Sequence, residues 1–135
     1  MERLVAGRER IYLDRFWNEL SWDRKRFDEA KRQHYAALYA QPGAMRASFA
    51  QFLAFRQDAA DNRTFLAHGN KLQMPVLAFG GDATFGPGIG EVIRCVADYV
   101  DDAIIPDCGH WITEEQPKAT TDLVVDFLRC ARSAT

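Results

Sequence analysis

Two short apolar runs are the segments of this 135-residue sequence that predict β-strands, and both lie in its second half. Residues 76–79 follow a proline and precede two glycines, and residues 103–105 end at another proline. A continuous apolar run such as residues 76–79 is typical of a parallel strand that is buried on both faces. Because two strands alone do not make a stable doubly wound sheet, we predict an α/β fold whose sheet is incomplete within this sequence.

Helical periodicity accounts for most of the remaining residues. Apolar side chains recur at the i, i+3, i+4 and i+7 spacing that places them on one face of a helix. The expected order is four helices followed by β-α-β-α, and the last part forms a right-handed crossover by default. On these patterns the predicted helices cover residues 3–20, 26–40, 43–58, 61–68, 88–98 and 117–132.

Composition and charge argue against several classes of protein. The net charge of −2 gives no general attraction for nucleic acids or anionic membranes. Residues 1–12 lack the apolar core of a signal peptide, and no apolar run is long enough to span a bilayer. Three cysteines without C-x-x-C spacing argue against a disulfide framework or a zinc site and favour a reducing cytoplasm. A basic cluster at residues 24–32 leaves a nucleic-acid binder as an alternative, although acidic residues interrupt it.

A histidine follows the second predicted strand. In residues 104–117, IIPDCGHWITEEQP, Pro106 and Gly109 break the regular backbone, so His110 is expected on a loop. Pro117 suits the first turn of the last helix. Open α/β sheets place their chemistry at the C-terminal ends of their strands. His110 is therefore the main catalytic candidate, and the alternative is a loop histidine that is hydrogen-bonded to a backbone carbonyl.

The pattern G-H-W-x-x-x-E-x-P at residues 109–117 resembles the loop that carries the catalytic histidine in α/β-hydrolases, particularly in the epoxide hydrolase and haloalkane or haloacid dehalogenase branch. This resemblance implies that residues 1–70 are the later part of a helical cap. Residues 71–135 would then be the last two strands of the hydrolase core with their helices. Three further runs resemble the same branch in the same order: GRERIYL at 7–13, PGAMRASF at 42–49 and PVLAFGGDATFGP at 75–87.

The resemblance also implies a reaction. It would be hydrolysis through a covalent ester intermediate, with His110 as general base, no metal or organic cofactor, and a small apolar substrate such as an epoxide, haloacid, haloalkane or ester. The nucleophile in such enzymes lies on a G-x-[SD]-x-G elbow, which this sequence does not contain. We therefore expect a C-terminal hydrolase fragment that is inactive alone. The alternative is a non-catalytic remnant or a module that completes its sheet with another chain, where an open sheet edge would allow self-association.

The partner of the histidine is less well defined by the sequence. Asp82 follows the strand at residues 76–79, where many α/β-hydrolases carry the triad acid. The commoner position is about two residues later, at Thr84, and in the branch that this chain most resembles the acid can lie on the preceding strand, outside this sequence. Asp82 is thus a candidate partner of His110, and the alternative is a turn aspartate that bonds its own backbone.

One position departs from the family pattern. Similar sequences often have a tyrosine just after the A-M-R-A-x-F run, from which it can donate a proton to an epoxide oxygen or a leaving halide. Phe52 stands there and has no such proton. Tyr12, Tyr35 or Tyr39 could substitute for it, although each is more often a packed aromatic residue.

Overall fold

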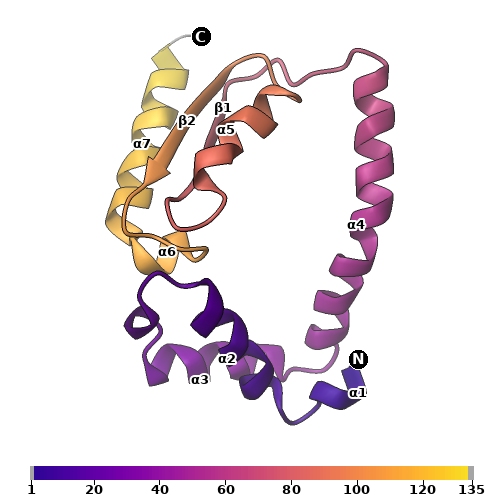
Figure 1. The fold of residues 1–135 in the computed structure, drawn as a ribbon, viewed down its shortest axis with the longest axis vertical. Helices are drawn as coiled ribbons and strands as arrows, with labels where there is room; N and C mark the ends of the chain where they lie inside the picture. The colour runs from indigo at the N-terminus through magenta and orange to yellow at the C-terminus, as the bar shows by residue number, and fades with distance from the viewer. Residues whose placement is uncertain (1, 134–135) are drawn as a thin grey trace. The chain divides into compact units, whose positions relative to one another are not determined.

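The computed structural model describes residues 2–133, which divide into two compact units. The first unit comprises the described residues of Met1–Glu19 together with Phe27–Gly69. The second comprises Leu20–Arg26 and the described residues of Asn70–Thr135. Figure 1 labels the helices and strands along the chain. The segment Leu20–Arg26 therefore belongs to the second unit, although it lies between two helices of the first unit in the sequence.

The first unit is helical, and its helices differ from the expected ones at two places. The predicted helix 3–20 is divided into α1 (Glu2–Val5) and α2 (Glu9–Leu20). Gly7 separates the two helices because it adopts a left-handed conformation, with φ at 73°. A side-chain oxygen of Glu9 accepts its backbone N–H. Helical periodicity continues across this glycine, so the sequence pattern alone did not reveal the break.

The next two helices also differ from the predicted ones in their bounds. The helix α3 (Glu29–Tyr39) begins later than predicted because Asp28 is its N-cap and accepts the backbone N–H of Lys31. The preceding turn, η1, covers Arg24–Arg26. The predicted helices 43–58 and 61–68 form one helix, α4 (Ala44–Ala67). Asp61, the first residue of the second predicted helix, lies inside α4 and accepts a hydrogen bond from Gln57.

An aromatic and charged cluster joins α2 to α3 in the first unit. Trp17 and Phe27 are buried and stack with their ring centroids 5.6 Å apart. The guanidinium of Arg32 lies over the Trp17 ring and donates to Asp14 and Asn18 of α2. Charge-assisted hydrogen bonds of this kind, together with the cation–π contact, fix the two helices against each other.

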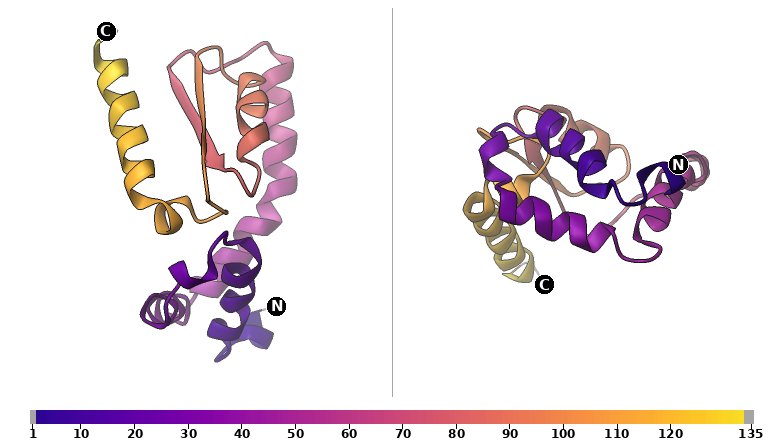
Figure 2. Two further views of the ribbon diagram at one scale, coloured as in Figure 1. Left: turned by 60° about the vertical axis from the view of Figure 1, so that its left-hand side comes forward. Right: turned by 90° about the horizontal axis from the view of Figure 1, so that it is seen from below.

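The second unit contains the predicted β-α-β-α order. The strands β1 (Val76–Gly81) and β2 (Val100–Ile105) pair in parallel, with Val76 opposite Val100 and Gly81 opposite Ile105. The helices are α5 (Gly86–Arg94), α7 (Pro117–Ser133) and a short α6 (Ile112–Glu115) that was not predicted. In both ribbon figures α5 and α7 flank the strand pair on opposite sides (Figure 1 and Figure 2). The prediction of an α/β fold with two parallel strands is confirmed.

The strands are less buried than the sequence suggested. In β1 only Ala78 and Gly81 are buried, and in β2 only Ile105 is. Ile104 is 51% exposed. The prediction that the first strand is buried on both faces is therefore wrong for this chain, because each strand has a single neighbour among the described residues. Within the same residues, no helix has the length and apolar character needed to cross a bilayer.

Candidate functional site

His110 lies on the segment between β2 and α6, at residues 106–111, which we call the histidine loop. Its imidazole is exposed and meets the ring of Trp111 edge-on, with centroids 4.9 Å apart. Asp107 has a left-handed backbone, with φ at 51°, and thereby turns the chain out of β2. This conformation costs little for an aspartate. The expected position of His110, on a loop at the C-terminal end of a parallel strand, is therefore what the structure shows.

The backbone N–H groups of the histidine loop are all hydrogen-bonded, although the imidazole of His110 is exposed. Each of the backbone N–H groups of residues 107–111 donates to an acceptor within the second unit. Two carboxylates, Asp82 and Glu115, accept four of them, and the carbonyl oxygen of Leu20 accepts the fifth, from His110. Satisfied backbone donors keep a loop in a single conformation, which a catalytic group requires.

Asp82 follows β1 and binds the start of the histidine loop. Its carboxylate oxygens accept the backbone N–H groups of Asp107 and Cys108, each at 3.1 Å. The amide of Cys108 is the main reason why the pKa of Asp82 lies below its usual value. Within the described residues no hydrogen bond joins this carboxylate to the imidazole of His110. The pairing of Asp82 with His110 therefore stays a prediction, and the bonds observed run to the backbone.

Glu115, at the end of α6, is 2% exposed. Its Oε1 accepts the backbone N–H groups of Gly109 at 3.1 Å and Trp111 at 3.3 Å. Its Oε2 accepts those of Trp22 at 2.7 Å and Asp23 at 3.2 Å. In the sequence Glu115 is only a position of the family pattern, and no role was predicted for it. No local signal could have supplied one, because half of its partners lie more than ninety residues earlier in the chain.

Two glycines allow the histidine loop to pack closely against its neighbours. A Cβ atom on Gly81 would lie 2.2 Å from the carbonyl oxygen of Cys108 and 2.3 Å from that of Gly109. A Cβ atom on Gly109 would lie 2.4 Å from the carbonyl oxygen of Leu20. Since these atoms belong to the backbone, they cannot move aside as a flexible side chain would. Any side chain at either position would clash with this backbone, so both positions require glycine. A glycine at each position is the only sign in the sequence that two backbone segments approach closely here.

Cys108 is buried next to the histidine and is a poor nucleophile. Burial, and then the neighbouring carboxylates of Glu115 and Asp82, raise the pKa of its thiol to about 11. The thiol is therefore protonated at neutral pH, and thiols react as thiolates. No group of three or more metal-ligating side chains occurs in the described part of the chain.

We expect thiol-specific reagents to distinguish the three cysteines. Cys95 and Cys130 are exposed, whereas Cys108 is buried. In the folded protein at neutral pH, the reagent 5,5′-dithiobis(2-nitrobenzoate) should modify two thiols per chain rapidly, and the third only after urea is added. A Cys108→Ser variant should show the same two rapid modifications and no third. Three rapid modifications in the folded wild-type protein would contradict the burial of Cys108.

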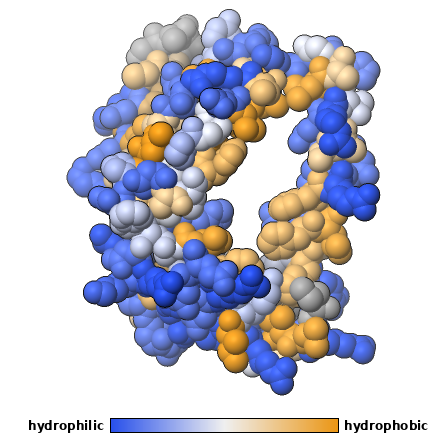
Figure 3. Space-filling model, viewed as in Figure 1, coloured by the Kyte–Doolittle hydropathy of each residue, from blue (hydrophilic) through white to orange (hydrophobic). Residues whose placement is uncertain are grey.

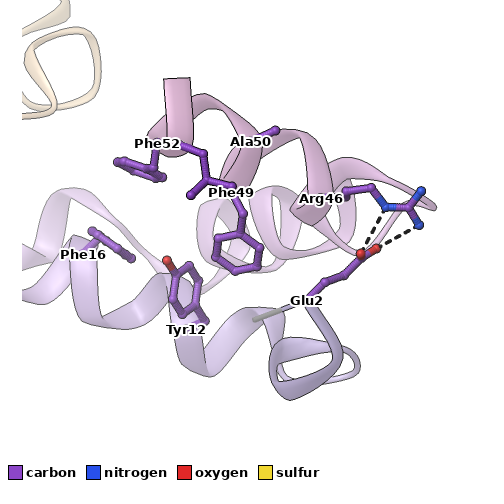
Figure 4. A pocket seen from close by; sticks show the side chains of 8 residues that line it. Glu2, Tyr12, Phe16, Arg46, Phe49, Ala50 and Phe52 are labelled. Atoms are coloured by element: carbon purple, nitrogen blue, oxygen red, sulfur yellow. Dashed lines mark hydrogen bonds and ion pairs between the residues drawn. The ribbon is translucent and has the colours of Figure 1, made fainter. Parts of the chain in front are cut away.

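The first unit has a pocket of its own, with a volume of about 600 Å³. It lies between α2 and α4, and Figure 4 shows the rings of Tyr12 and Phe49 next to each other in its lining, where they meet edge-on with centroids 5.7 Å apart. Phe52, the position where similar sequences carry tyrosine, also lines this pocket, and so does Tyr12 among the proposed substitutes. Tyr35 packs instead against Trp17 and Phe27. The pocket is therefore mostly aromatic and apolar.

The α4 side of this pocket is exposed, and exposed apolar side chains continue along the helix. Phe52 and Leu53 of the pocket lining are 55% and 81% exposed, and Phe55, which follows them, is 54% exposed. In the space-filling view, apolar residues are visible along α4 (Figure 3). So many large apolar side chains on one helix mark a surface that is suited to contact with another apolar surface.

Comparisons with known proteins found relatives over most of this chain, although no family model matches it. A soluble epoxide hydrolase from Corynebacterium sp. (strain C12) is 26% identical over 126 residues, which are 92% of this chain and 43% of that protein. Among solved structures, Cfl2 from Burkholderia cenocepacia is 36% identical, with a TM-score of 0.84 over 93% of this chain and 42% of that one. The epoxide hydrolase CorEH is 26% identical, with a TM-score of 0.84, over 94% of this chain and 44% of that chain. The chain thus spans less than half the length of the relatives that it matches.

Proposed function

We propose that this chain, a homologue of the epoxide hydrolases of the α/β-hydrolase superfamily over part of their length, carries the general-base histidine of such a hydrolase. The observation that carries the proposal is His110 itself. An exposed imidazole follows a parallel strand, on a loop whose backbone donors are all bonded. We further propose that residues 1–70 are a cap segment and residues 71–135 the last part of the hydrolase core.

In the proposed reaction a carboxylate nucleophile, from residues outside this sequence, attacks an epoxide carbon. The C–O bond of the epoxide breaks, an ester forms, and the alkoxide takes up a proton. His110 then removes a proton from water, which attacks the ester carbonyl and releases a diol. Asp82 serves this step by binding the backbone of the histidine loop. No metal or organic cofactor is needed for any of these steps.

A small apolar substrate would suit the first unit. Its pocket is lined by aromatic and aliphatic side chains, with the ion pair of Glu2 and Arg46 at its rim. Among epoxides, haloacids, haloalkanes and esters, we propose an epoxide as the substrate, because two of the relatives are named as epoxide hydrolases. Phe52 lines this pocket without a proton to donate, whereas Tyr12 supplies a hydroxyl to the same lining.

The test begins with the 135-residue chain and the coding sequence upstream of Met1. Hydrolysis of styrene oxide, an activated ester and a haloacetate by this chain alone should show no turnover that depends on His110. An in-frame G-x-D-x-G upstream of Met1, and hydrolysis of styrene oxide by the extended chain, would support the proposal. Turnover by the 135-residue chain that His110→Ala abolishes would show that the nucleophile lies within it, and would overturn the proposed division of catalytic residues.

A second candidate is a module that completes its sheet against another chain. The observation that favours it is the exposed Ile104 on a strand that pairs only with β1 among the described residues. Exposed strand edges of this kind promote association. Sedimentation of the purified chain at increasing concentration should then show a reversible dimer. A monomer at all concentrations would exclude self-association through this edge.

A further inference from the structure

We propose that Glu115 is a positioning residue for His110, and that it acts by joining the histidine loop to the segment formed by residues 20–23. The catalytic meaning of this inference rests on the proposed function, but the joining of the two segments does not. Glu115 is among the most deeply buried side chains of the described residues, and it is a carboxylate. A buried charge is costly unless it is fully bonded, so its partners define its role.

The bonds of Glu115 divide evenly between two backbone segments. One oxygen accepts from Gly109 and Trp111, on either side of His110, and the other accepts from Trp22 and Asp23. The two oxygens of a carboxylate offer about four lone-pair sites, and here four N–H groups occupy them. This side chain therefore holds together two segments that are far apart in the sequence, and it lies 93 residues after Trp22 itself.

His110 depends on the second of these segments directly. Its own backbone N–H donates to the carbonyl oxygen of Leu20, at 2.9 Å. Gly109 packs against the same segment so closely that a Cβ atom would lie 2.6 Å from the backbone nitrogen of Trp22. Releasing residues 20–23 would thus remove the acceptor of His110 and the surface against which its loop packs.

A carboxylate is needed at this position because glutamine has the same shape but half the acceptors. In Glu115→Gln one oxygen becomes an NH₂ group, which would face two N–H donors whichever way the amide turns. Two of the four bonds are lost in either orientation, and the link between the segments is broken. The substitution therefore tests the link with almost no change in side-chain volume.

The experiment compares Glu115→Gln with Glu91→Gln, which removes an exposed carboxylate in the same unit. Amide hydrogen exchange by NMR should be at least about tenfold faster at Gly109 and Trp111, or at Trp22 and Asp23, in Glu115→Gln. Amides of the β1–β2 pairing should remain protected. The nuclear Overhauser contact between the rings of His110 and Trp111 should weaken in the same variant. Unchanged exchange at all four amides and an unchanged ring contact would overturn the proposal.

A measurement on the wild-type protein covers the case in which Glu115→Gln fails to fold. If one carboxylate binds all four amides, their N–H groups should become exposed in the same opening event. Their protection factors should then agree within about threefold. Protection factors that differ by more than about tenfold between the two pairs would show that the segments open separately, and would overturn the link.

The catalytic meaning is tested in the extended chain of the proposed function. Glu115→Gln should lower kcat for epoxide hydrolysis, leave KM unchanged and alter the pH profile of kcat, whereas Glu91→Gln should change none of these. A variant that is only less stable would keep the wild-type kcat and pH profile in the molecules that remain folded. If His110→Ala has no effect on hydrolysis, the proposed function fails, whereas linked exchange of the four amides would still support the joining role of Glu115.

Discussion

Replacing His110 by alanine should lower kcat for epoxide hydrolysis by on the order of 10⁴-fold in the chain extended to include its nucleophile, by analogy with the loss of a base in other hydrolytic sites. The imidazole is exposed, so its removal should leave the fold intact. If His110 serves only the hydrolysis of the ester, the first step should survive in the variant. One equivalent of epoxide should then remain bound to the protein as an ester.

Mass spectrometry of the intact variant measures this directly. After incubation with styrene oxide, His110→Ala should gain the mass of one substrate molecule, and the wild-type protein should not. His68→Ala is the matched control, since His68 is exposed and bonds only its own helix, through Thr64. Equal kcat values for His110→Ala and the wild type would contradict the general-base role. If His110→Ala has a lowered kcat but gains no substrate mass, His110 acts in the first chemical step instead.

Replacing Gly81 by alanine should lower the free energy of unfolding by about 3 kcal/mol, the upper part of the range for forcing atoms into a packed site. The added Cβ would lie 2.2 Å from the carbonyl oxygen of Cys108. The histidine loop would have to move away from β1, and the hydrogen bond from Ala83 to Cys108 would be lost with it. Small domains are stable by only about 5–15 kcal/mol, so this is a large fraction of the total.

Urea unfolding followed by circular dichroism measures the change, and Gly88→Ala is the control. The atoms nearest to a Cβ on Gly88 would be those of the Phe85 ring, at 3.2 Å and beyond, and a side chain of this kind can move aside. Alanine is also the better helix former by about 1 kcal/mol, so this variant should be close to the wild type in stability. Equal unfolding midpoints for Gly81→Ala and Gly88→Ala would show that the loop yields without cost and that its close packing is unimportant.

The sequence predicted the elements whose signals are local. The apolar runs gave both strands, and the breakers Pro106 and Gly109 placed His110 on a loop after the second one. The failures have local causes as well. The apolar spacing of a helix continues through Gly7, whose left-handed conformation divides the helix. The break that was predicted between residues 58 and 61 lies inside the continuous helix α4.

The support of the site could not be predicted in the same way. The pairing of Asp82 with the imidazole stays a prediction, and the sequence did not indicate that this carboxylate binds the backbone N–H groups of Asp107 and Cys108. Glu115 was part of a family pattern, but its bonds to Trp22 and Asp23 join residues that no sequence pattern connects. Hydrogen bonds from side chains to a distant backbone leave no periodic signal, because any residue can supply a backbone N–H group.

The separation of 93 residues between Trp22 and Glu115 also affects when this site can form. Closing a flexible chain over that distance costs about 4 kcal/mol of conformational entropy, so the contact is expected late in folding. During synthesis at about 5–20 residues per second, residues 20–23 leave the ribosome roughly 5–20 s before Glu115 does. For that interval the N–H groups of Trp22 and Asp23 lack the carboxylate that accepts them in the folded chain. The order of synthesis therefore makes the histidine loop one of the last parts of this chain to reach its final structure.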